Sequence, residues 1–204
     1  MYSGFALCSE RIFRMEEYTS YETVKEKLIT AGIKELQHHG VADFSLRRVA
    51  SACNVSCAAP YKHFKSKEDF ISEILMYINR QWELLQNQVK DFFGNDTKSL
   101  IAELCVAYVK FRIANPGFNA VLMMKTDCFD EKQIAGAHMT DYICSMCKEF
   151  FEQNGLDTDE TDRKIYVIRS LIYGAVIMID KNQMENSKKT IDMIRECVGK
   201  ELKF

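Results

Sequence analysis

Five basic side chains are concentrated in one short segment of this chain, and their chemistry suits the binding of phosphate. They are Arg47, Arg48, Lys62, Lys65 and Lys67. Residues 45–67 contain no Asp or Glu, although the whole chain has 29 acidic and 27 basic residues. Positive charge gathered on one segment of an acidic protein attracts polyanions, above all nucleic acids. The segment therefore predicts a phosphate-binding surface; the alternative is a basic face that is merely solvated.

Two short helices joined by a tight turn are expected to position these side chains. Ser45 is a good N-cap, and apolar residues follow it at helical spacing, namely Leu46, Val49, Ala50 and Cys53. Asn54 tolerates the left-handed backbone of a turn, and Ser56 can cap a second helix. Pro60 lies near the start of that helix, so we expect the loss of its N–H to matter little. This pattern is typical of a helix-turn-helix, which makes double-stranded DNA the first candidate partner.

From about Val24 to Phe70 the chain resembles the N-terminal domain of the TetR family of transcriptional regulators. The resemblance begins with LITAGIKELQHHG at 28–40 and continues with Ser45-x-Arg47-x-Val49-Ala50 and Asn54-Val55-Ser56. It ends with YKHF at 61–64 and KSKEDF at 65–70. The ordered run covers roughly 47 residues, just under a quarter of the chain, without a gap.

The resemblance implies a homodimer whose two heads enter successive major grooves of a palindromic operator, and it implies repression. The positions that it assigns to phosphate contacts are Ser45, Arg47, Tyr61, His63 and Lys67. The charge pattern adds Arg48 to the DNA-binding set. Base reading would fall to Ser56, Cys57, Ala58 and Lys62. Cys57 and Ala58 suit a thymine methyl group, so we expect thymine contacts and DNA shape to supply much of the specificity.

Long stretches of 3.6-residue periodicity and only two prolines predict an all-α fold. We expect a flexible arm at residues 1–19, a helix-turn-helix domain at 20–66, and an effector-binding and dimerisation domain at 67–204. Helices are expected at about 66–89, 98–114, 132–153, 159–180 and 187–202, with a short element at 117–125.

The helix expected at 159–180 contains SLIYGAVIMI, which is apolar around most of its circumference. A second copy of the same surface would cover such a helix, so we predict an isologous homodimer, with the central helix of a monomeric bundle as the alternative. The predicted interface residues are Tyr166, Ile172, Ile177, Ile191 and Ile194. Gly174 would allow a neighbouring backbone to approach closely.

Aromatic and methionine side chains are abundant after residue 80 and could line an apolar pocket for a small hydrophobic effector. The predicted ligand-binding residues are Trp82, Tyr108, Phe111, Met123, Tyr142, Met146 and Tyr173. This half of the chain also resembles, more weakly, TetR-family effector domains that carry a Trp-Ser-Leu-Val-His-Gly-like sequence. Residues 169–174 keep that frame, with Arg169 in place of Trp and Tyr173 in place of His.

Other functional classes have little support in the sequence. There is no Gly-rich phosphate loop, nucleophile elbow or HExxH motif, so we expect neither an enzyme nor a cofactor. Cys144 and Cys147 lack further metal ligands at suitable spacing, so no metal site is predicted. Without an export signal or a long apolar run, a cytoplasmic location with no membrane partner is expected. Two alternatives stay open, namely a redox-sensing regulator acting through cysteine oxidation and a helical ligand carrier without DNA binding.

Overall fold

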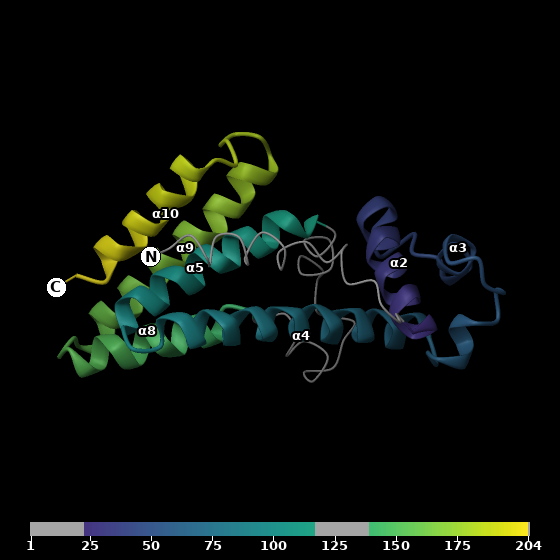
Figure 1. The fold of residues 1–204 in the computed structure, drawn as a ribbon, viewed down its shortest axis with the longest axis horizontal. Helices are drawn as coiled ribbons and strands as arrows, with labels where there is room; N and C mark the ends of the chain where they lie inside the picture. Colours follow the sequence, from purple (N-terminus) through teal and green to yellow (C-terminus); the bar gives the residue numbers. More distant parts are fainter. Residues whose placement is uncertain (1–22, 117–138, 204) are drawn as a thin grey trace. The chain divides into compact units, whose positions relative to one another are not determined.

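The structure, a computed structural model, describes residues 23–116 and 139–203, and within these ranges its elements are helices without strands (Figure 1). This confirms the predicted all-α fold. In chain order the elements are α2 (Val24–His39), α3 (Leu46–Ala52), the 3₁₀-helix η2 (Pro60–Lys62), α4 (Lys67–Phe93), α5 (Thr97–Ala114), α8 (Asp141–Gln153), α9 (Thr158–Asp180) and α10 (Lys188–Glu201).

Side-chain caps determine where several of these helices begin. At α2, Thr23 Oγ1 accepts a hydrogen bond from the Glu26 amide at 3.2 Å, and the Glu26 carboxylate accepts one from the Thr23 amide at 2.8 Å. This reciprocal capping box satisfies two amides that the helix itself cannot pair. Three further helices have a simpler cap, in which one side-chain oxygen accepts a hydrogen bond from a backbone amide of the first turn. The capping residues are Ser45 for α3, Asp157 for α9 and Ser187 for α10.

Four expected segments differ from the structure in their bounds or lie outside the described residues. The helix after Ser66 continues to Phe93 instead of ending near Val89. The helix expected at 132–153 begins at Asp141, because Met139 and Thr140 form a turn, and residues 132–138 lie outside the described residues. The short element expected at 117–125 and the arm expected at 1–19 also lie outside them.

The described residues form two compact units. The first comprises residues 23–81 with 115–116, and the second comprises 82–114 with 139–203. The division between the two units falls within α4. The reason is that the first turns of α4 contribute to the core of the first unit: Phe70 packs edge-on against Phe64, with ring centroids 4.2 Å apart.

In the second unit, α5 is the central helix and packs against α8, α9 and α10. Its side chains from Leu100 to Val109 are almost all buried. The Trp82 ring lies against Tyr108 and Phe111, and its indole N–H donates to the Met139 carbonyl at 2.7 Å. Within the described residues, no helix has both the length and the apolar content needed to span a membrane.

Candidate nucleic-acid interface

The turn after α3 has the left-handed residue that the sequence predicts. Asn54 has a φ of 54°, a conformation that Asn adopts at lower cost than most residues. The Val55 amide then donates to the Ala50 carbonyl at 3.1 Å, which ties the chain back to the end of α3. Leu46, Val49 and Ala50 are buried, so the apolar stripe of α3 faces the core as expected.

The element after the turn is shorter than predicted. Residues 57–59 form a turn and Pro60–Lys62 a 3₁₀-helix, in place of the α-helix expected from Ser56 onward. With Ser56 as the cap, residue 60 would donate the first intrahelical hydrogen bond, and proline has no N–H to donate. The Ala59 amide donates to the Ser56 carbonyl at 2.9 Å instead, which is the tighter spacing of a turn. Our expectation that Pro60 would have little effect is therefore wrong.

The residues predicted to read bases are all exposed around this element. Ser56, Cys57, Ala58 and Lys62 are open to solvent, and the Tyr61 side chain, predicted to contact phosphate, is 63% exposed. His63 is also exposed, while the neighbouring Phe64 is buried and anchors the segment. The segment therefore exposes small and polar side chains to solvent, while the buried Phe64 ring holds it against the core.

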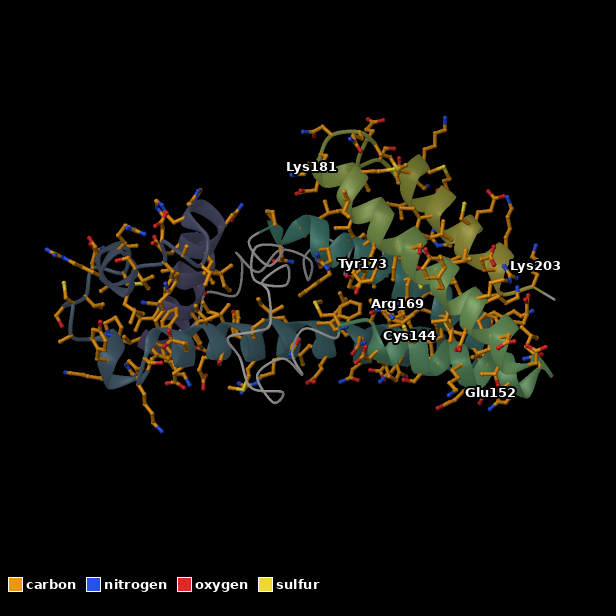
Figure 2. All side chains as sticks on the ribbon, turned by 180° about the vertical axis from the view of Figure 1, so that it is seen from behind. Cys144, Glu152, Arg169, Tyr173, Lys181 and Lys203 are labelled. Carbon is orange, nitrogen blue, oxygen red and sulfur yellow. The ribbon has the colours of Figure 1, made fainter. Side chains whose placement is uncertain are left out.

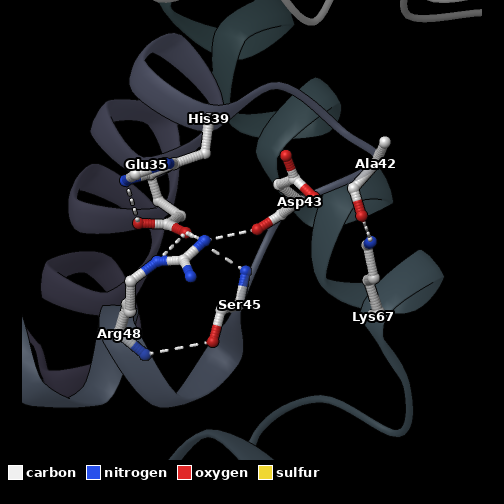
Figure 3. A network of polar contacts seen from close by, with 7 residues as sticks. All are labelled: Glu35, His39, Ala42, Asp43, Ser45, Arg48 and Lys67. Atoms are coloured by element: carbon white, nitrogen blue, oxygen red, sulfur yellow. Dashed lines mark hydrogen bonds and ion pairs between the residues drawn. The ribbon is translucent and has the colours of Figure 1, made fainter.

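The basic residues divide into two groups. Arg47, Lys62 and Lys65 are exposed, and within the described residues their side chains form no ion pair or hydrogen bond. Lys67 is half-buried; its Nζ donates to the Ala42 carbonyl at 3.4 Å and lies 6.0 Å from the centroid of the Phe44 ring (Figure 3). The first group can approach a phosphate without giving up an internal partner.

Arg48 has an internal anionic partner that the sequence did not reveal. Its Nε donates to Glu35 Oε1 at 2.7 Å, and its Nη2 pairs with the same carboxylate and with the Asp43 carbonyl (Figure 3). The hydrogen bond that Arg48 donates to the Glu35 carboxylate raises the pKa of Arg48. Residues 45–67 contain no acidic residue, but the fold places Glu35 of α2 beside Arg48. Arg48 therefore has an acidic neighbour in the folded protein.

The predicted ligand residues lie in the second unit, except Met123, which is outside the described residues. Trp82, Tyr108 and Phe111 are buried against one another, while Tyr142, Met146 and Tyr173 are half-buried. Two arginines that the prediction missed accompany them. Arg112 is 6% exposed and donates to the Tyr108 hydroxyl at 2.5 Å, and Arg169 hydrogen-bonds to Tyr173 on α9, beside Cys144 of α8 (Figure 2).

Burial raises the pKa of all three thiols in this region. The pKa of Cys147 rises to about 12, and those of Cys105 and Cys144 also rise, because a thiolate is poorly solvated there. A protonated thiol is a weak nucleophile. The Cys144-x-x-Cys147 pair thus has the properties of core residues, and the described residues hold no group of ligands suited to a metal ion.

The residues predicted for the dimer interface separate into core and surface. Ile172, Ile191 and Ile194 are buried within the second unit. Tyr166 and Ile177 are 72% and 50% exposed. Met178 and Met193, which the prediction did not include, are exposed as well.

Residues 28–74 match the family described as bacterial regulatory proteins, tetR family. The matched segment includes most of α2, all of α3, the turn and the exposed residues described above. Over these residues the chain is similar to regulators of the TetR family. Among curated relatives, the chain is 23% identical over 145 residues, 71% of its length, to the uncharacterised HTH-type transcriptional regulator YerO of Bacillus subtilis. It is 26% identical over 110 residues, 53% of its length, to the probable acrEF/envCD operon repressor of Escherichia coli.

The aligned parts cover 46% and 50% of these two relatives, so the chain spans about half of their length. Solved TetR-family structures share the fold over more of the chain. A TetR-family regulator from Bordetella parapertussis superposes with a TM-score of 0.67 at 14% identity, covering 89% of this chain and 95% of that one. FadR of Bacillus subtilis in complex with stearoyl-CoA superposes with a TM-score of 0.64 at 13% identity, covering 86% and 96%.

Proposed function

We propose that this protein is a transcriptional repressor of the TetR family that binds a palindromic DNA operator as a homodimer and is released by a small hydrophobic ligand. The observation that carries the DNA-binding part is the surface around the Asn54 turn. There, Arg47, Lys62 and Lys65 are exposed without an internal partner in the described residues. Small uncharged side chains occupy the element between them, so a major-groove floor could approach without steric hindrance.

In this proposal, phosphate contacts and base contacts come from different residues. Ser45, Arg47, Tyr61, His63 and Lys67 fix the position on the backbone, which carries no sequence information by itself. Ser56, Cys57, Ala58 and Lys62 face the bases. Because residues 57–62 form only a turn and a 3₁₀-helix, the number of base edges within reach is small. DNA shape and half-site spacing would then contribute much of the specificity.

Two observations support an apolar effector: the aromatic side chains of the second unit, and a solved structure of similar fold that contains a bound ligand. The rings of Trp82, Tyr108 and Phe111 form an aromatic cluster, and the Tyr108 ring also contacts the Tyr173 ring. FadR of Bacillus subtilis, which shares the fold, was solved with stearoyl-CoA. Bound ligand lowers DNA affinity only to the extent that it prefers the conformation that does not bind DNA.

Fluorescence anisotropy on DNA from the region upstream of the protein's own gene, with random-sequence DNA as the control, tests the proposal. We expect saturable binding to one palindromic site that weakens steeply with salt, because phosphate contacts release counterions. Equal and weak binding to both DNAs would contradict a specific operator in that region. No binding even at low salt would contradict DNA binding altogether and favour a ligand carrier.

A further inference from the structure

The Glu35 carboxylate is the centre of a polar network that joins α2 to the start of α3. Glu35 is only 9% exposed, yet it accepts from three N–H groups (Figure 3). The donors are the Ser45 amide at 3.2 Å, Arg48 Nε at 2.7 Å, and Arg48 Nη2. His39 Nε2 lies 3.8 Å from the other carboxylate oxygen. A buried carboxylate is tolerated only when it is compensated in this way.

We propose that Glu35 is a positioning residue that holds Arg48 away from DNA, so that Arg47 and not Arg48 binds phosphate. This inference rests on the proposed DNA binding. It assigns a role to Glu35, a residue outside the basic segment, and it removes Arg48 from the predicted DNA-binding set.

The first argument concerns direction. Neighbouring residues on a helix point about 100° apart, so Arg47 and Arg48 project from different sides of α3. Arg48 and Glu35 both line an open groove of about 460 Å³ between α2 and α3. Arg47 does not line this groove and is exposed without an ion pair in the described residues. On the groove side of α3, Arg48 is therefore paired with Glu35 of α2, while the Arg47 side carries no such pair.

The second argument concerns charge at the start of α3. Its first turn contains two arginines and no acidic residue, although the positive end of the helix dipole favours anions. Glu35 supplies the missing anion from α2 and also accepts from the amide of the N-cap residue Ser45. Arg48 additionally binds the Asp43 carbonyl, which fixes the loop before α3. Moving Arg48 to a phosphate would break its contacts with Glu35 and with the Asp43 carbonyl, and would leave the buried carboxylate without its arginine.

The test is the salt dependence of binding to a random-sequence duplex, measured by fluorescence anisotropy for single variants. Each phosphate contact contributes about 0.9 to the slope of log K against log salt concentration. We expect Arg47→Ala to lower the slope by about 0.9 per bound protomer. We expect Arg48→Ala to leave it unchanged. Glu35→Gln should raise it, by up to about 0.9 per protomer, because the released Arg48 can then reach a phosphate.

A double variant separates the charge effect from damage to the fold. Glu35→Gln with Arg48→Gln removes both charges and keeps hydrogen-bonding groups, so we expect the wild-type slope. Circular dichroism confirms that each variant is folded at the temperature of the binding assay. An equal loss of slope in Arg47→Ala and Arg48→Ala would overturn the positioning role while leaving DNA binding intact. A wild-type protein without salt-dependent binding would overturn the proposed function and this inference together.

Discussion

Lys164 illustrates how a single buried cation stabilises the second unit. Its side chain is only 8% exposed, and its Nζ donates to the carbonyls of Glu201 and Lys203 at 2.8 and 3.2 Å. These carbonyls belong to the end of α10, where a helix leaves its last acceptors unpaired and a cation is favoured by the dipole. Lys164 on α9 therefore fixes the C-terminal end of α10.

Replacing Lys164 with Met should lower the melting temperature while keeping the fold. Hydrogen bonds to a charged group contribute roughly 1.5–3 kcal/mol, and a chain of this length loses roughly 2–4 °C per kcal/mol. We therefore expect a decrease of roughly 3–12 °C in a circular dichroism melt. Lys200→Met is the matched control, because Lys200 pairs with Glu196 on an exposed face of α10. Equal decreases in both variants would contradict the capping role of Lys164.

Thiol reactivity should follow burial. Cys57 is exposed beside the predicted base-reading residues, while Cys105 and Cys147 are buried. Burial raises the pKa of the Cys147 thiol to about 12, so at pH 8 it carries its proton and reacts slowly. We expect brief treatment with iodoacetamide at pH 8 to modify Cys57 and to spare Cys105 and Cys147, as read by peptide mass spectrometry. Rapid modification of Cys147 in the folded protein would revive the redox-sensing alternative.

The sequence identified most basic residues of the candidate interface but could not decide which of them are available. Arg47 and Lys62 have the exposure that a contact surface requires, as the charge pattern and the family resemblance led us to expect, while Ser45 is half-buried. Arg48 is an arginine next to Arg47 in the sequence, yet it is paired with Glu35, which lies 13 residues earlier in the chain. The packing of α2 against α3 creates this pair, and a count of charges along a segment cannot include it.

At the scale of elements, the turn between α3 and η2 depends on one backbone conformation. Asn54 has a φ of 54°, which costs most L-residues about 1–2 kcal/mol. We expect Asn54→Ala to destabilise the protein by about 1 kcal/mol and Asn54→Gly to have little effect, because glycine adopts this conformation freely. Urea denaturation measures both. Equal stability of the two variants would show that the turn does not need the left-handed backbone.

The contact between α2 and α4 requires the absence of a side chain at Gly32. A Cβ atom there would lie 2.3 Å from Cε1 of Phe70, far inside van der Waals contact. We expect Gly32→Ala to destabilise the protein by about 1–3 kcal/mol, as other overpacked cores do. Gly199 in α10 is the control, because a Cβ there would meet no atom within 4 Å. Gly199→Ala should stabilise by about 0.5 kcal/mol in the same denaturation assay, since alanine favours helix.

The difference between α3 and the element after the turn shows what local sequence can determine. The cap and apolar spacing of α3 act within seven residues, and the observed helix, Leu46–Ala52, follows them. The next segment has a cap at Ser56 as well, but Pro60 removes the first hydrogen bond that an α-helix would form. The sequence contains this information, because Pro60 is the fourth residue after the cap Ser56. The amide at that position is the first one that would donate a hydrogen bond within the helix, so it is not one of the amides that a helix start leaves unpaired.

At the scale of the whole molecule, an exposed apolar face of the second unit is the feature that a homodimer would explain. Tyr166 and Ile177 are 11 residues apart on α9, which places them three turns apart on one face. Their side chains are 72% and 50% exposed, and Met193 on α10 is 45% exposed. The predicted apolar helix at 159–180 thus has a buried side and an open side, and the sequence could not assign residues 171–179 to either because they form one uninterrupted apolar run.

Ile177→Glu should convert the proposed dimer into a monomer. A charge at the centre of an apolar interface would lose its hydration without gaining a partner. Light scattering after size exclusion should then give the 23.6 kDa mass of one chain instead of twice that value. Leu84→Glu is the control, because Leu84 is also exposed, at 57%, but lies on α4 and not on α9 or α10.

The same two variants link assembly to DNA binding. A monomer presents one helix-turn-helix, so it contacts half as many phosphates as a dimer, and the salt slope of binding should fall by about half. We therefore expect Ile177→Glu to halve the slope on random-sequence DNA and Leu84→Glu to leave it unchanged. A monomeric wild-type protein with the full slope would show that one copy suffices for binding, and the exposed face of α9 would then serve a partner other than a second copy.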